Sequence, residues 1–155
     1  MESVNANANL ILPGLWLGNK KAAADTEFIT HNDISVVFNC TKELPFNSSI
    51  RRGYRVPVHD NLEASEIANM EKWAPEIIYK LVSEYKAGNK ILVHCHAGMQ
   101  RSAAVIAMML IAVFNKTTDN AILYIRERRA IAFFPSANFD KAIRGFEAYF
   151  AQSKK

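Results

Sequence analysis

The sequence predicts a single α/β domain in which a central, mostly parallel sheet is flanked by helices. Three observations support this fold class. The chain has 155 residues, which is about the length of one domain. Half of its residues are apolar, so it can bury a hydrophobic core. Short β-branched and aromatic runs alternate with longer helical patterns, as they do where helices cover a central sheet.

The beginning of the chain is polar and rich in asparagine. We interpret residues 1–9 as a flexible tail and residues 10–151 as the domain. The run at residues 10–18 is apolar but interrupted by a Pro-Gly pair, which is typical of two short strands around a turn.

One short helix and two more strands are expected before residue 60. Asp25 is a candidate cap for a short helix that runs to His31. Residues 34–40 form a continuous β-branched and aromatic run, which predicts a strand buried on both faces. Residues 53–58 predict another strand.

Helical patterns dominate the second half of the chain. Residues 65–87 predict a helix in two pieces, because Pro75 fits the first turn of a helix better than its interior. Residues 90–94 predict a short buried strand. Three more helices are expected: one begins just after Arg101, one runs from Thr118 or Asp119 to about Arg129, and one spans residues 138–150.

The net charge of +4 favours anionic ligands in general but is too small to indicate nucleic acid. Basic residues gather in two clusters, at residues 51–55 and 126–129. We interpret each cluster as a solvated turn or helix face.

Two cysteines cannot form a disulfide framework, which favours a reducing compartment. The start of the chain lacks the pattern of a signal peptide, so a cytoplasmic location is expected, with the nucleus as an alternative. The longest apolar run, residues 103–114, is too short to span a bilayer. We interpret it as a buried helix and expect no membrane association.

The stretch VHCHAGMQRS, residues 93–102, sets a cysteine between two histidines and leaves five residues between Cys95 and Arg101. Four interpretations are open: a metal site, a redox thiol, an inert turn, or a loop that holds an anion against a thiolate. A zinc site would recruit His59 and Cys40. Adjacent strand residues point to opposite faces, so His94 and Cys95 are poorly placed to share a metal.

The order of strand, tight loop and helix favours the anion loop. Ligands of open α/β sheets bind beyond the carboxyl ends of strands, beside helix N-termini whose unpaired N–H groups attract anions. Gly98 lets the loop amides converge on one anion, and the same field stabilises a Cys95 thiolate. Arg101 can bind two oxygens of a tetrahedral oxyanion. A nucleophile and a phosphate clamp that face one cavity predict phosphoryl transfer.

The stretch HCHAGMQRS matches His-Cys-x-x-Gly-x-x-Arg-Ser/Thr and so resembles the signature of the cysteine-dependent protein tyrosine phosphatases. The flanking segments LPGLWLGNKKAA, VVFNCTKEL and VPVHD are similar to the small dual-specificity subfamily. The resemblance covers residues 10–150. It implies a protein phosphatase that hydrolyses phosphotyrosine and phosphoserine/threonine through a phosphocysteine intermediate, with no metal or organic cofactor.

The resemblance also implies a role for each signature residue. Cys95 is the expected nucleophile, and Arg101 is expected to bind the phosphoryl group. Ser102 is expected to donate a hydrogen bond to the sulfur, although it can equally be an ordinary helix-capping serine. His94 is expected to support the loop without transferring protons. The phosphate-binding backbone amides are expected to be those of His96, Ala97, Gly98, Met99, Gln100 and Arg101.

A general acid must protonate the leaving oxygen. By the resemblance it is the aspartate of the VPVHD segment, Asp60, which lies 35 residues before Cys95. This spacing is longer than expected and leaves Glu63 and Glu66 as rivals.

Three positions depart from the family pattern or add to it. Ser136 stands where the family often has an asparagine that braces the phosphate loop, so a different brace is expected. Asn138 stands at a glycine position, where asparagine tolerates a left-handed backbone. Cys40 is either a plain buried cysteine or a redox partner that forms a reversible disulfide with Cys95.

The expected partners are phosphorylated protein substrates, acted on by a monomer or a homodimer. Two alternatives are open: a phosphatase for RNA 5′-phosphates or phosphoinositides, and a non-catalytic module that binds phosphoproteins. Residues 96–100 include no lysine or arginine, which argues against highly anionic ligands. The lack of interleaved aromatic and basic residues argues against nucleic acid.

Overall fold

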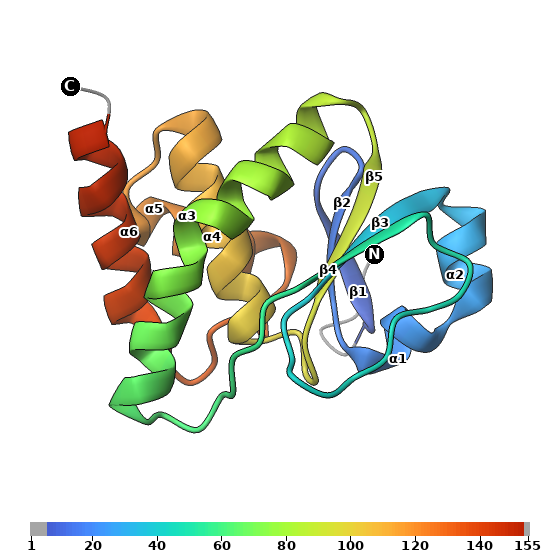
Figure 1. The fold of residues 1–155 in the computed structure, drawn as a ribbon, viewed down its shortest axis with the longest axis horizontal. Helices are drawn as coiled ribbons and strands as arrows, with labels where there is room; N and C mark the ends of the chain where they lie inside the picture. The colour runs from blue at the N-terminus through green and yellow to red at the C-terminus, as the bar shows by residue number, and fades with distance from the viewer. Residues whose placement is uncertain (1–5, 154–155) are drawn as a thin grey trace.

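The computed structural model describes residues 6–153, which form a five-stranded sheet flanked by helices on both faces (Figure 1). The strands are β1 (Ala8–Leu12), β2 (Leu15–Gly18), β3 (Ile34–Asn39), β4 (Arg52–Arg55) and β5 (Lys90–His94). The helices are α1 (Lys20–Ala24), α2 (Thr26–His31), α3 (Ala64–Lys86), α4 (Arg101–Phe114), α5 (Thr118–Arg128) and α6 (Asp140–Ser153). The predicted fold class is confirmed.

The strands lie in the order β1-β2-β5-β3-β4. The β1–β2 pair is antiparallel, whereas β2–β5, β5–β3 and β3–β4 are parallel. The carboxyl ends of β2, β3, β4 and β5 therefore meet at one edge of the sheet. The segments that follow these four strands gather there, which is where ligands bind in open parallel sheets.

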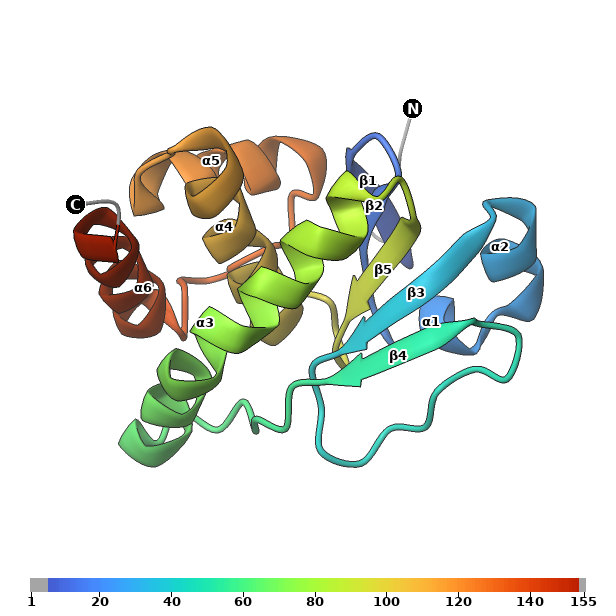
Figure 2. The same cartoon turned by 45° about the horizontal axis from the view of Figure 1, so that its top comes forward.

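Helices α1 and α2 cover one face of the sheet, and α3 to α6 cover the other, as Figures 1 and 2 show. The larger hydrophobic core lies between the sheet and α3 to α6. A smaller core lies under α1 and α2 and consists of Ala23, Ile29, Ile34, Val37 and Leu92. Strand β3 contributes to both cores, which explains its continuous apolar run.

Side-chain caps begin the two short helices. Asp25 accepts a hydrogen bond from the backbone N–H of Phe28 and so starts α2, as predicted. Helix α1 was not predicted from the sequence. Its cap is Asn19, whose side-chain oxygen accepts from the backbone N–H groups of Lys21 and Ala22.

Helix α3 is continuous, so the predicted break at Pro75 is wrong. The proline has no N–H to donate to the carbonyl of Glu71, which costs about 3 kcal/mol in a helix interior. Burial of apolar side chains on both sides of the proline offsets this cost, at about 1.5–3 kcal/mol for each large one. The buried apolar residues of α3 are Met70, Ala74, Ile77, Ile78 and Leu81.

Two expected boundaries also differ from the structure. Strand β1 begins at Ala8 and Asn9 is buried, so these two residues of the expected tail belong to the sheet. Residues 1–5 lie outside the described residues. Strand β4 ends at Arg55 instead of residue 58, because the chain leaves the sheet towards Pro57, which cannot donate a ladder hydrogen bond.

Helix α4 is almost entirely buried, as the apolar run predicted. Within residues 6–153 no single helix is long and apolar enough to cross a bilayer. Helices α4 and α5 meet that criterion only when taken together, and they form a pair bent by 118°.

Candidate active site

The loop between β5 and α4, residues 95–100, forms the base of the candidate site. Strand β5 ends at His94, and Cys95 follows with 2% of its surface exposed. Its Sγ lies 3.1 Å from the Oγ of Ser102 in the first turn of α4. The hydroxyl of Ser102 is thus placed to donate a hydrogen bond to a thiolate at this position.

Gly98 is required by the path of this loop. Its φ of +67° lies in the left-handed region, and an added Cβ would stand 2.5 Å from the carbonyl oxygen of Gly18 at the end of β2. Any other residue would therefore strain the backbone and collide with the neighbouring strand. The loop rests directly on β2 at this point.

The loop presents unsatisfied backbone donors. The backbone N–H groups of residues 96–100 have no acceptor within the described part of the chain. The N-cap of α4, Gln100, makes no side-chain capping bond, so the N–H groups of the first helical turn are also free. Together with the positive end of the helix dipole, these donors form a binding site for an anion.

Arg101 is held by one end of its guanidinium. Nη1 donates a hydrogen bond to the carbonyl of Val58 at 3.0 Å, and only 7% of the residue is exposed. Its Nε is buried and has no partner among the described residues. A buried N–H without an acceptor is costly. A phosphate oxygen in the loop would satisfy it, so the arginine is arranged to meet an oxyanion.

Arg129 lies beneath the loop and is 1% exposed. Two of its nitrogens donate to the loop: Nε to the carbonyl of Gly98 at 2.8 Å, and Nη2 to the carbonyl of Ala97 at 3.2 Å. The third, Nη1, donates to the carbonyl of Ala6 and to Oδ1 of Asn9, each at 2.8 Å. The sequence interpretation of this arginine as part of a solvated cluster is wrong. Arg129 thus satisfies two backbone carbonyls of the loop and leaves its amides as the unpaired backbone groups.

Gln100 braces the loop from the other side. Its Nε2 donates to the carbonyls of Phe134 and Ser136, and its Oε1 accepts from the backbone N–H of Asn138. The sequence predicted that the loop would be braced differently because Ser136 lacks an amide. The brace found here is the side-chain amide of Gln100, a residue inside the signature, which contacts residues 134–138.

Asp60 lies in the segment between β4 and α3, two residues beyond the Val58 carbonyl that binds Arg101. Its Oδ1 accepts a hydrogen bond from the side-chain amide of Asn138 at 2.9 Å. One short segment thus contacts Arg101 and carries the candidate acid. Asn138 does not have a positive φ, so the expected reason for an asparagine here is wrong. Its side chain holds Asp60 instead.

The two rival carboxylates differ in their contacts. Glu66 accepts from the backbone N–H of His59 and from Lys42, and these contacts lower the pKa of its carboxyl. Glu63 is the N-cap residue of α3. A carboxylate that is held ionised by several donors is a poor proton donor, which favours Asp60 over Glu66.

His94 supports the loop through its Nδ1, which lies 3.3 Å from the carbonyl of Cys95. Because a carbonyl only accepts, Nδ1 carries the proton. Burial, together with the nearby cations Arg55 and Arg101, lowers the pKa of His94 to about 4. The imidazole is therefore neutral near pH 7, which is consistent with a supporting role.

His96 faces outward from the loop and binds the carboxylate of Glu43 through Nε2. This hydrogen bond lowers the pKa of Glu43. The contact joins the catalytic loop to the segment after β3. The sequence expectation used only the backbone amide of His96, and its side-chain contact was not foreseen.

Cys40 follows β3 just as Cys95 follows β5. The preceding residues, Asn39 and His94, are paired in the parallel ladder, and the N–H of Cys40 donates to the carbonyl of His94 at 2.8 Å. The two cysteines are therefore neighbours across the sheet. Burial raises the pKa of the Cys40 thiol well above its ordinary value, and the proximity of Cys95 raises it further.

Metal ligands do not gather at this edge of the sheet. Within residues 6–153 no three histidine, cysteine or acidic side chains are placed to hold one ion.

A family model described as the dual specificity phosphatase catalytic domain matches residues 15–149. The chain therefore belongs to the dual-specificity phosphatases, within the superfamily of cysteine-dependent protein tyrosine phosphatases.

Relatives in sequence and in structure agree with this assignment. Human dual specificity protein phosphatase 8 is 29% identical over 131 residues, which are 83% of this chain and 20% of that protein. Tyrosine-protein phosphatase vhp-1 of Caenorhabditis elegans is 30% identical over 136 residues, 84% of this chain and 20% of that protein. This chain spans about a fifth of the length of these two relatives. The crystal structure of DUSP15 matches with a TM-score of 0.83 and 26% identity, covering 96% of this chain and 92% of that one.

Proposed function

We propose that the chain is a protein phosphatase that hydrolyses phosphotyrosine and phosphoserine/threonine through a phosphocysteine intermediate. One observation carries the proposal. The unpartnered Nε of the buried Arg101, the first residue of α4, and the unpaired loop amides adjoin Cys95, whose Sγ lies 3.1 Å from the hydroxyl oxygen of Ser102. This arrangement can hold a phosphoryl group against a nucleophile.

In the first step the thiolate of Cys95 attacks phosphorus, and the bond from phosphorus to the ester oxygen breaks. Asp60 in its protonated form gives its proton to the departing oxygen, so the product leaves as an alcohol or phenol. Arg101 and the loop amides hold the equatorial oxygens, whose charge they stabilise in the transition state.

In the second step water attacks phosphorus and the sulfur–phosphorus bond breaks. Asp60, now ionised, takes a proton from the water, and inorganic phosphate is released. The sulfur leaves as a thiolate, and the hydroxyl of Ser102 stabilises its charge by a hydrogen bond. The enzyme returns to its starting protonation state.

Protein substrates of both kinds are favoured by the size of the chain and by its family. No long insertion separates the elements that carry the site, so the cleft is expected to be shallow enough for the short phosphoserine side chain as well as phosphotyrosine. The side chains of residues 96–100 add no fixed positive charge, which disfavours ligands with several phosphates. One structural neighbour is described as PTPMT1 in complex with PI(5)P, so a phosphoinositide is a substrate to compare.

The test is hydrolysis of para-nitrophenyl phosphate between pH 4.5 and 8 by the wild type and by the Cys95→Ser and Asp60→Asn variants. We expect Cys95→Ser to be inactive and Asp60→Asn to be slow, with the basic limb of the pH profile lost. Matched phosphotyrosine and phosphoserine peptides, a phosphoinositide and an RNA 5′-phosphate then rank the substrates. A folded, reduced wild type that binds phosphopeptides without hydrolysing any of these substrates would identify a binding module instead.

A further inference from the structure

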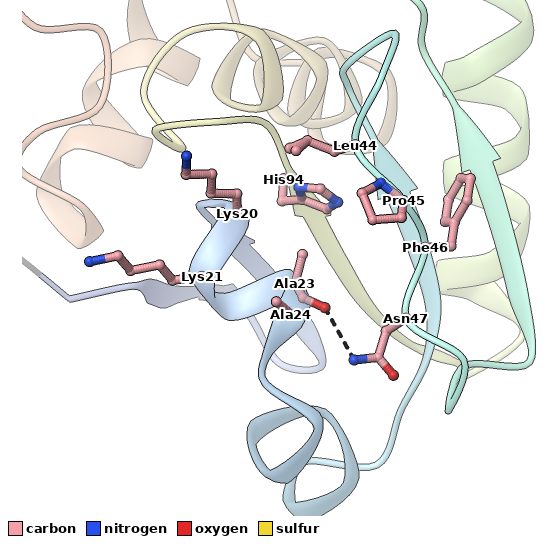
Figure 3. A pocket seen from close by; sticks show the side chains of 9 residues that line it. All are labelled: Lys20, Lys21, Ala23, Ala24, Leu44, Pro45, Phe46, Asn47 and His94. Atoms are coloured by element: carbon pink, nitrogen blue, oxygen red, sulfur yellow. Dashed lines mark hydrogen bonds between the residues drawn. The ribbon is translucent and has the colours of Figure 1, made fainter.

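A second pocket lies beside the catalytic loop, between α1 and the segment of residues 44–47 (Figure 3). We call it the α1 pocket. Its volume is about 500 Å³, and most of its wall is apolar, formed by Ala23, Ala24, Leu44, Pro45 and Phe46. Of the signature residues only His94 lines it. It is therefore separate from the phosphate cradle, although it lies directly behind the residue that precedes the nucleophile.

His94 contributes an unpaired acceptor to the α1 pocket. The residue is 1% exposed, and its Nε2 has no hydrogen-bond partner within the described residues. Because Nδ1 carries the proton and binds the Cys95 carbonyl, Nε2 of the neutral ring is an acceptor. Figure 3 shows the ring between Lys20 and Pro45, among the side chains that line the pocket. A ligand with a hydroxyl or N–H group would satisfy this nitrogen, which is otherwise costly to bury.

Lys20 and Lys21 supply positive charge at the rim. Both are exposed, and neither forms an ion pair within residues 6–153. Helix α1 is fixed next to the loop because the N–H of Lys20 donates to the carbonyl of His96 at 3.0 Å. A ligand that enters the α1 pocket thus meets apolar side chains along the wall and one acceptor at the inner end. Figure 3 shows the amino groups of Lys20 and Lys21 directed away from the pocket, so an anionic group of the ligand contacts them only when these exposed side chains turn towards its mouth.

We propose that the α1 pocket binds a small amphipathic organic anion whose hydroxyl or N–H group donates to Nε2 of His94. The apolar body of the ligand lies between α1 and Phe46, and its carboxylate or phosphate faces Lys20 and Lys21. The site is distinct from the phosphate cradle, so its ligand binds together with inorganic phosphate. The binding does not depend on the proposed phosphatase activity.

The test uses 3-(4-hydroxyphenyl)propionate as the probe, on protein with ¹⁵N-labelled imidazoles and saturating inorganic phosphate. The Nε2 resonance of His94, assigned by its loss in His94→Gln, is expected to move with probe concentration. Two matched compounds each lack one feature: 3-phenylpropionate has no hydroxyl, and 4-propylphenol has no carboxylate. Each is expected to bind about three- to tenfold more weakly, as the loss of one polar contact predicts.

Variants locate the probe independently of the resonance. Lys20→Gln is expected to weaken binding about threefold, whereas Lys72→Gln, an exposed lysine of α3, leaves it unchanged. Ala24→Phe, which fills the pocket from its rim, is expected to abolish binding. Three results would overturn the proposal: a His94 resonance that does not move at millimolar probe, equal affinity for all three compounds, or displacement of the probe by phosphate. A His94 resonance that does not move would leave an ordered water as the hydrogen-bond partner of Nε2.

Discussion

The side-chain amide of Asn138 donates a hydrogen bond to Oδ1 of Asp60 across 2.9 Å. The backbone N–H of the same asparagine donates to Oε1 of Gln100, also at 2.9 Å. A chain of two hydrogen bonds thus runs from the loop after β5 to the proposed general acid. The position of the acid is set by the segment before α6, far from it in the sequence.

Loss of the Asn138 side chain is expected to impair proton donation more than phosphate binding. In Asn138→Ala the backbone contact to Gln100 is retained, but Asp60 loses its donor. We expect kcat for phosphotyrosine to fall about three- to tenfold with little change in KM. The fall should be smaller for para-nitrophenyl phosphate, whose leaving group needs less protonation.

The matched control is Asn120→Ala, which removes an exposed asparagine of α5. Its kinetics are expected to equal those of the wild type. An equal loss for both substrates in Asn138→Ala would instead assign the asparagine to the loop as a whole.

Arg129 is expected to contribute to both stability and phosphate affinity. Arg129→Met leaves the carbonyls of Ala97 and Gly98 without their buried donor. We expect the free energy of unfolding to fall by about 3 kcal/mol and the inhibition constant for inorganic phosphate to rise. Urea unfolding and competition with para-nitrophenyl phosphate measure the two effects.

Arg126→Met is the control, because Arg126 is exposed in α5, the helix that Arg129 caps. Its unfolding free energy is expected to stay within about 0.5 kcal/mol of the wild type. If the two variants were equally stable, Arg129 would not be the support that its contacts indicate.

His94 is expected to make the protein less stable as the pH falls. The ordinary pKa of 6.5 applies to the unfolded chain, whereas burial lowers the pKa of His94 to about 4 in the folded state. Between these values the unfolded chain binds a proton that the folded protein does not. Stability is therefore full above pH 6.5 and is lost as the pH falls towards 4. For one histidine the loss from pH 6.5 to 4.5 is about 2 kcal/mol.

Urea unfolding at pH 6.5 and pH 4.5 measures this loss. His94→Asn is expected to lose about 2 kcal/mol less than the wild type over the same interval. His31→Gln, at an exposed position in α2, is expected to retain the loss of the wild type. If His94→Asn lost as much stability between pH 6.5 and pH 4.5 as the wild type, the loss would not come from His94.

Cys40 is expected to protect Cys95 from irreversible oxidation. Peroxide oxidises the Cys95 thiolate to a sulfenic acid and is itself reduced to water. The Cys40 thiol then displaces water from the sulfenic acid, which forms a disulfide. We expect dithiothreitol to restore peroxide-treated wild type and to restore Cys40→Ser several-fold less. If dithiothreitol restored the wild type and Cys40→Ser equally, Cys40 would be only a buried residue of the core.

The sequence was sufficient for the elements that depend on local chemistry. The buried runs of β3, β5 and α4 and the cap at Asp25 all appear as predicted. The loop at residues 95–101 could be located because strand, glycine, arginine and helix are contiguous. Cys95, Arg101 and Ser102 consequently lie together as expected.

Contacts between distant segments could not be predicted in this way. Arg129 belongs to a basic cluster whose composition indicates a solvated surface, and only the fold shows that the loop covers it. Gln100 occupies a position in the signature whose side chain the pattern leaves open. Helix α3 continues past Pro75 because the packing of its apolar side chains outweighs the helix-breaking preference of proline. Such packing cannot be inferred from any single residue.

Arg129 also links the order of synthesis to the appearance of activity. It ties together the first described residues, Ala6 and Asn9, and the catalytic loop at Gly98. A nascent chain that has emerged from the ribosome only as far as α4 already carries both the proposed nucleophile and the arginine proposed to bind phosphate. It still lacks the guanidinium that binds the carbonyls of Ala97 and Gly98 in the loop. We therefore expect a translating ribosome to expose no competent site until the second half of the chain has folded onto the first.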